Sequence, residues 1–399
     1  MHDPRKRVRT ALTGSVAVAI WLTGRPAAAL DVGPEPWSVE THAFVSQGFI
    51  LTKSNNYLDQ GTTQGSFQFS EVGVNLTKSI TDRFRVGVQL FAQDLGPSGN
   101  YNIKADWFYL DYRFNNLLGI RVGRVKIPFG LYNDVVDIDS ARTSVLLPQS
   151  VYPEENRNYL LAQTGGEVYG YASLGRAGGL DYHAYGGTIY ADVSSSSGSP
   201  YSIQDFNVPY LVGGRVMWDS PIDGLRLGGS VQSLRLDATL LANSPLPSGV
   251  LLSSNIQIPA VLWVASAEYT AENFQVAAEY SRWYVGLNSS NPMFVPGTAT
   301  VTSERGYLLA TYRTNRWLQV GGYYSVLFPD VDDRNGRENV QHDVAATLRF
   351  DLNDHWLLKL EGHFMIGTAG LDSTLNNNVP LSSLDQAWGA FLAKTTAYF

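Results

Sequence analysis

Three arginines recur at matching positions of neighbouring sequence segments. Arg85, Arg113 and Arg121 each lie within a few residues of a short turn, in stretches that alternate between apolar and polar residues. Side chains at every second position of a strand share one face of a sheet. The three guanidinium groups are therefore expected at one height on one wall, where they would attract anions or pair with carboxylates.

Other charged residues fall on the same polar face of their segments. Further basic candidates are Arg215, Arg226 and Lys359. Acidic candidates are Asp111, Glu167, Asp181, Glu268, Glu279 and Glu361. These groups can act on a passing solute through their electric field, or they can simply pair with one another and hydrate the wall.

A long segment between two alternating stretches is rich in acids. Residues 128–161 contain Asp134, Asp137, Asp139, Glu154 and Glu155 against Arg142 and Arg157, and Arg124 and Lys126 lie close to its start. Loops beyond about 15 residues are uncommon unless they have a function. Acids on such a loop facing bases on a wall would create a transverse field that orients dipolar solutes. If Asp134, Asp137 and Asp139 project into open water, a weak cation preference is expected. If the acids face the arginine row, selectivity should be slight.

Catalytic motifs are weak. Gly170-Tyr-Ala-Ser173-Leu-Gly175 is one residue away from a nucleophile elbow. The chain has no cysteine, which removes thiol chemistry. A lipid-active barrel enzyme would need Ser and His facing lipid, whereas His42, His183 and His363 fall on the polar parity. Residues 330–336 are acidic, but Gly336 is one place late for a calcium loop. We therefore expect no enzyme, cofactor or metal site, with the lipid-active enzyme as an alternative.

The segments that carry these residues are strands. Runs of about ten or more residues alternate with a period of two, and seven tight connections alternate with eight longer ones. The tight ones lie at 79–82, 115–118, 175–179, 219–224, 270–273, 314–316 and 351–354, and the longer ones near 52–65, 95–101, 128–161, 192–207, 238–254, 286–301, 328–337 and 368–384. Sixteen strands follow: 37–51, 66–79, 82–94, 102–114, 118–127, 162–174, 179–191, 208–218, 224–237, 255–269, 273–285, 302–313, 316–327, 338–350, 355–367 and 385–399.

An even number of long strands with short and long connections in alternation indicates an all-β fold, a transmembrane antiparallel β-barrel in the outer membrane. Aromatic residues at the short-turn ends predict an interfacial girdle, formed by Trp37, Phe84, Phe114, Trp218, Phe274, Trp317, Trp356 and Phe399. In a barrel this wide, side chains cannot fill the interior, so an aqueous channel is expected. A strand ending in Phe399 is typical of outer-membrane proteins that present it to their assembly machinery.

The first 29 residues resemble an export signal. A basic start, an apolar stretch from Ala11 to Leu22 and Ala27-Ala28-Ala29 predict cleavage near Leu30. The alternative is a retained membrane anchor. Residues 30–399 would then form a single barrel domain with 24 bases and 35 acids, since residues 1–29 hold five of the 29 bases and one of the 36 acids. This acidic balance argues against a nucleic-acid partner.

One short motif carries a family resemblance. Gly123, Lys126, Pro128, Phe129 and Gly130 are similar to the G-x-x-K-x-P-F-G strand end of the phosphate-selective porin O and P family. The resemblance implies a homotrimer from a Gram-negative outer membrane, with the loop after strand five folded into the pore. It also implies basic, phosphate-binding funnels, but this chain departs from that pattern through its few lysines and its acidic loop.

These observations predict a porin for passive diffusion of small hydrophilic solutes and ions, surrounded by outer-membrane lipid. A substrate-specific channel for anions or sugars, with Trp107, Tyr109 and Tyr185 as a sliding track, is the alternative. The predicted pore-lining residues are Arg85, Arg113, Arg121, Arg124, Lys126, Asp134, Asp137, Asp139 and Arg142.

Overall fold

A computed structural model describes residues 30–32, 38–96, 99–190, 201–243, 252–291 and 298–399. The predicted signal segment 1–29 and Trp37 lie outside the described residues, as do parts of four predicted loops. Among the described residues, no helix is long and apolar enough to span a membrane.

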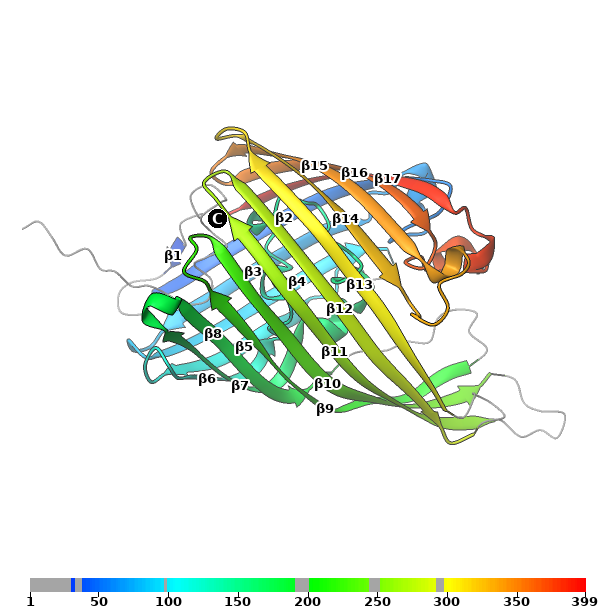
Figure 1. Ribbon diagram of the computed structural model, residues 1–399, viewed down its shortest axis with the longest axis horizontal. Coiled ribbons are helices and arrows are strands. Elements are labelled where there is room, and N and C mark those ends of the chain that lie inside the picture. The colour runs from blue at the N-terminus through cyan, green and yellow to red at the C-terminus, as the bar shows by residue number, and fades with distance from the viewer. Residues whose placement is uncertain (1–29, 33–37, 97–98, 191–200, 244–251, 292–297) are drawn as a thin grey trace, which may run out of the picture.

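Sixteen antiparallel strands form a closed barrel (Figure 1). They are β2 (Val39–Lys53), β3 (Phe69–Ser79), β4 (Phe84–Leu95), β5 (Lys104–Arg113), β6 (Gly119–Lys126), β7 (Ala162–Ser173), β8 (Gly179–Thr188), β9 (Tyr201–Asp219), β10 (Leu225–Ala242), β11 (Ser253–Thr270), β12 (Phe274–Ser289), β13 (Thr298–Arg313), β14 (Leu318–Phe328), β15 (Gln341–Asn353), β16 (Trp356–Gly367) and β17 (Ala387–Tyr398). Each pairs with its sequence neighbours, and β17 pairs with β2 from Gly389 opposite Lys53 to Tyr398 opposite Phe44. A three-residue strand, β1 (Leu30–Val32), pairs with the start of β2. The predicted fold class and strand number are confirmed.

Period-two alternation separates the two faces of the barrel wall. Leu110 and Val344 point outward, with 51% and 52% of their surface exposed, while the adjacent Asp111 and Asp343 are buried inside. Aromatic side chains at the short-turn ends are also exposed, as the girdle prediction requires: Phe114, Phe274, Trp317, Trp356 and Phe399. The barrel therefore has the apolar outer surface and polar inner surface of an outer-membrane protein.

Strands β9 to β13 extend beyond their predicted ends and project past the rest of the barrel on the long-loop side (Figure 1). Backbone pairing between β9 and β10 continues to Tyr201 opposite Ala242. A register shift between Arg235 and Asp237 interrupts the alternation. The extra residues lie on β9, and a bulge changes the phase of the period-two pattern, which explains why residues 201–207 are strand where the sequence predicts loop. Residues 238–242 are also strand and not the predicted loop, in continuous register with β11 up to Leu241.

Candidate functional site

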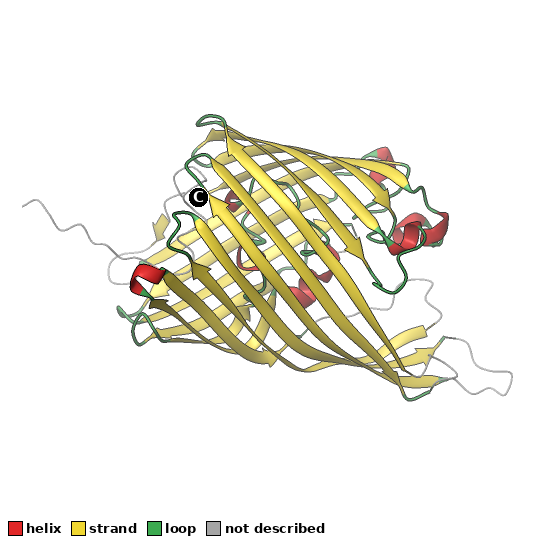
Figure 2. Ribbon diagram, viewed as in Figure 1, coloured by secondary structure: helices red, strands yellow, loops and turns green. Residues whose placement is uncertain are grey.

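The segment between β6 and β7 folds into the barrel, as predicted for residues 128–161. Figure 2 shows its short helical turns and loops behind the front strands. They are η3 (Asn133–Val135), η4 (Asp139–Ala141), η5 (Glu154–Asn156) and α1 (Arg157–Leu160). Ile127, Phe129, Val145 and Val151 have no exposed surface. We call residues 127–161 the inward loop, and its apolar side chains pack it firmly against the wall.

Glu279 on β12 holds both halves of the inward loop. Its carboxylate accepts hydrogen bonds from the Leu131 amide (2.9 Å) and from the hydroxyl of Tyr152, two residues of the loop. Tyr307 on β13 and Ser266 on β11 donate to the same carboxylate over 2.8 and 2.5 Å. A buried carboxylate needs such donors to offset its lost hydration, so this acid is used to position the loop.

Glu361 on β16 holds the middle of the inward loop. It accepts the backbone N–H groups of Val145 and Leu146 at 2.8 and 3.0 Å. Arg349 on β15 donates to the carbonyl oxygens of Ser140 and Arg142 at 2.6 and 3.1 Å. Two wall charges thus bind the backbone of the loop, and neither is available to a solute.

Asp139 is an ionic anchor of the inward loop. Its carboxylate lies 2.9 Å from Lys359 Nζ, 3.5 Å from Lys394 Nζ and 2.6 Å from the Thr396 hydroxyl. Burial alone would raise the pKa of Asp139, but attraction to Lys359 and Lys394 outweighs it and holds that pKa well below its usual range. Asp139 is therefore ionised and fully engaged at neutral pH.

The other two aspartates of the inward loop are also paired. Asp137 is almost completely buried and binds Lys126 and the Gln89 amide, the latter at 2.7 Å. Burial opposes ionisation here too, yet Lys126 lowers the pKa of Asp137. Asp134 pairs with Arg215 of β9 at 2.8 Å and keeps 34% of its side chain exposed. Neither of the two arrangements considered for these acids is found, because wall bases other than the arginine row pair with all three.

The predicted arginine row forms around Tyr109. Arg85 and Arg121 lie 5.8 and 5.0 Å from the centre of the Tyr109 ring. Asp111 is opposite both arginines in the strand register, and Arg113 follows it two residues later on β5. The structure therefore brings Arg85 and Arg121 to one height of one wall, and Arg113 lies one inward position further along β5, opposite Gly119 of β6.

Acids of the same wall neutralise part of this row. Arg121 pairs with Asp111 at 3.3 Å and with Glu167 at 2.9 Å. Glu167 also contacts the ring of His183, and that ring lies 3.2 Å from the Asp181 carboxylate. Because opposite charges alternate along β5 to β8, the wall presents closely spaced dipoles to the lumen.

The remaining predicted pore residues have structural contacts. Arg124 donates to the Asp106 carbonyl oxygen at 2.8 Å, and the Asp106 carboxylate lies 2.5 Å from Arg157. Arg142 donates to the carbonyl oxygens of Val136 and Val145 within its own loop. These arginines stiffen the inward loop and its entry and do not extend the arginine row.

Three bases with contacts inside the barrel are not among the predicted site residues. Arg349 and Lys394 bind the inward loop, and Arg305 lines a cavity beside it. All three lie on the inward parity of their strands, so the alternation could have placed them in the lumen. It could not show that they meet a loop that comes from the other side of the barrel.

The acidic residues 330–336 form a hydrogen-bonded turn, in which Asp330 accepts the Asp332 amide at 3.0 Å. Among the described residues, no group of three or more His, Cys, Asp or Glu side chains is placed to hold a metal ion.

No protein-family model matches this sequence, and no curated protein matches it significantly. Solved structures do. OmpT of Vibrio cholerae, in the form expressed in the outer membrane, is 9% identical to this chain with a TM-score of 0.56, and the similarity covers 93% of this chain and 100% of OmpT. The in-vitro folded form of OmpT gives the same TM-score and coverage at 10% identity. The anion-selective porin of Comamonas acidovorans is 12% identical with a TM-score of 0.52, and the similarity covers 91% of this chain and 99% of that porin. OmpF of Salmonella typhi (14% identity, TM-score 0.52) is covered completely, over 93% of this chain. The chain has the sixteen-stranded barrel fold of outer-membrane porins.

Proposed function

We propose that this protein is an outer-membrane porin for passive diffusion of small hydrophilic solutes and ions. The observation that carries the proposal is the charged inner wall, with Arg85, Arg121, Asp111 and Glu167 lying inside a barrel whose outer face is apolar. Charged side chains in such numbers are stable inside a membrane only where they pair or meet water. The inward loop narrows this aqueous interior without contributing chemistry.

Planar-bilayer recording tests the proposal. Purified, folded protein is expected to give discrete steps of ohmic conductance in KCl, and heat-unfolded protein should give none. Folded, heat-modifiable protein that inserts without any conductance would contradict it. Lipid hydrolysis in place of conductance would favour the lipid-active enzyme. In support of a non-enzymatic role, His42, His183 and His363 lie on inward positions of their strands, and the outward His342 is bonded to Tyr324 at 2.8 Å.

A second candidate is a substrate-specific channel for anions or sugars. Trp107 and Tyr109 stack with 5.4 Å between ring centres and an angle of 14° on the inner wall, beside Arg85 and Arg121. An aromatic surface next to guanidinium groups suits a sugar or a phosphate-bearing solute. Tyr185 takes no part in this pair, because it is buried and donates to Gln232 at 3.1 Å. Saturable block of the current by one such solute would support this candidate, and its absence would favour general diffusion.

We further propose a homotrimer surrounded by outer-membrane lipid. One solved form of the Vibrio cholerae OmpT is a trimer (10% identity, TM-score 0.50, 90% of this chain and 99% of that chain). Phe399 is proposed to contact the assembly machinery, and in the folded barrel its backbone pairs with Ala43 at 3.0 and 3.1 Å. Native mass measurement in mild detergent checks the trimer, which a stable monomer would contradict.

A further inference from the structure

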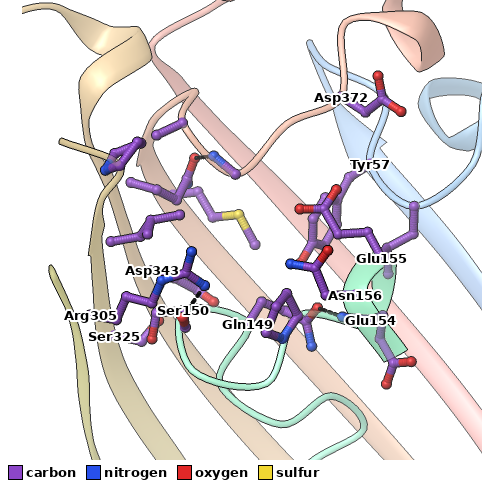
Figure 3. Close-up of a pocket in the computed structure, with 18 of the residues that line it drawn as sticks. Tyr57, Gln149, Ser150, Glu154, Glu155, Asn156, Arg305, Ser325, Asp343 and Asp372 are labelled. Carbon is purple, nitrogen blue, oxygen red and sulfur yellow. Dashed lines mark hydrogen bonds between the residues drawn. The ribbon is translucent and has the colours of Figure 1, made fainter. Parts of the chain in front are cut away.

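A cavity of about 300 Å³ lies beside the inward loop on its long-loop side. Residues of the inward loop form one wall, and strands β12 to β17 form the other (Figure 3). Tyr57 and Asp372, from the first and last long loops, also line it. A volume of this size is in the range that holds a small organic molecule.

Arg305 of β13 is held rigidly in this cavity. Its guanidinium lies 3.4 Å from the centre of the Trp283 ring. Its Nε donates to Ser303 Oγ at 3.1 Å and its Nη1 to the Ser150 carbonyl oxygen at 3.2 Å. No described carboxylate lies within 4.0 Å of this guanidinium, unlike those of Arg121, Arg215 and Arg349. A preorganised arginine without an acidic partner, in a cavity, is suited to bind a carboxylate from outside.

Acids face Arg305 from the opposite side of the cavity. Figure 3 shows Glu155 on the inward-loop side and Asp372 above it, whereas Arg305 lies across the cavity beside Asp343. Asp343 is already satisfied by His363 at 3.0 Å. Burial raises the pKa of Glu155, as does the neighbouring charge of Asp372. Two acids that repel each other at an accessible rim are suited to bind an ammonium group.

The middle of the cavity is apolar. Val285, Leu327 and Met365 contribute to its lining between the two charged sides. A molecule with one charge would satisfy only one end, and a neutral molecule would satisfy neither. We propose that this cavity binds zwitterionic solutes of the amino-acid or short-peptide class, with the carboxylate on Arg305 and the ammonium on Glu155 and Asp372.

This inference rests on the proposed channel function and names a solute class for it. The probes are glycine, diglycine and triglycine, each compared with its N-acetylated form and its C-terminal amide. Each is added on the long-loop side of single channels in planar bilayers. We expect saturable block of the current by at least one of the zwitterions. Loss of either terminal charge should weaken the block about tenfold or more. Arg305→Gln should abolish the preference for a free carboxylate, and Glu155→Gln the preference for a free amine.

Arg305→Lys keeps the charge and is expected to restore part of the carboxylate preference. Arg334→Gln is the matched control, because Arg334 lies outside the cavity, 3.3 Å from Glu304; its block should equal that of the original chain. Heat-modifiability checks that each variant is folded, and a failed Arg305→Gln leaves the Glu155→Gln comparison. Channels that conduct but are not blocked, or are blocked equally by zwitterions and capped peptides, overturn this inference and leave the channel function intact. If the unsubstituted protein gives no conductance at all, the proposed channel function itself is overturned.

Discussion

Asp139 is the residue on which the inward loop depends most directly. Removing its charge in Asp139→Asn leaves Lys359 buried beside a neutral amide, whereas Lys394 keeps its pair with Glu71 at 2.7 Å. Breaking a buried pair in this way costs about 3–5 kcal/mol. We predict a loosened loop, seen as new current fluctuations and faster proteolysis within residues 127–161. Asp134→Asn is the control, because this acid is one-third exposed and its loss should have a much smaller effect. If Asp139→Asn showed no more current fluctuation than Asp134→Asn, Asp139 would not be an anchor of the inward loop.

The pKa shifts in the loop predict how it responds to acid. Because the pKa of Asp139 is lowered in the folded state, its stabilisation is present above the unfolded pKa and is lost only as pH falls through the lower folded value. The raised pKa values of Glu154 and Glu155, caused first by burial, act in the opposite direction and favour the folded state as pH falls. The loop should therefore stay anchored down to about pH 4, near the ordinary aspartate pKa. Current noise recorded between neutral and acidic pH checks this, and noise that appears well above that pH would contradict it.

At the scale of elements, Tyr152 links the second half of the inward loop to the barrel. Its hydroxyl donates to Glu279 and accepts the amides of Leu131 and Tyr132 at 2.9 and 3.1 Å. Tyr152→Phe removes these bonds and leaves buried partners unsatisfied, at a cost of about 1–3 kcal/mol. We predict a lower unfolding temperature and flickering conductance. Tyr190→Phe is the control, since Tyr190 is 71% exposed, and it should change neither quantity.

The strands were predictable because burial on one face imposes a period of two. All sixteen were placed, and β3, predicted at 66–79, is Phe69–Ser79. The start of β9 was not predictable, because two irregularities in its pairing with β10 interrupt the period of two there. The site was predictable in part: parity placed Arg85 and Arg121 beside each other. It could not show which wall bases the loop acids meet, because Asp139 and Lys394 are 255 positions apart in sequence.

At the scale of the whole molecule, pairing of charges should limit ion selectivity. Asp137 and Asp139 are neutralised by lysines, and Arg121 by Asp111 and Glu167. Screening in salt confines the influence of a charge to about 8 Å, so each of these neutralised pairs should contribute little to ion selection. We predict a weak cation preference or none, measured as a reversal potential across a KCl gradient. A strong chloride preference would contradict this and would favour the phosphate-porin resemblance.

If the inner face of the barrel lines a water-filled path and the outer face contacts lipid, neighbouring positions of one strand should differ in their access to water. The absence of cysteine in the sequence permits a direct measurement, in which single cysteines are introduced at adjacent positions of β5. Tyr109→Cys places a thiol on the inner face, and Leu110→Cys places one on the outer face, where Leu110 is 51% exposed. A charged, membrane-impermeant thiol reagent is then added during planar-bilayer recording. We expect rapid reaction and a stepwise loss of current for Tyr109→Cys, with no change for Leu110→Cys. Reaction at Leu110→Cys together with an inert Tyr109→Cys would contradict it.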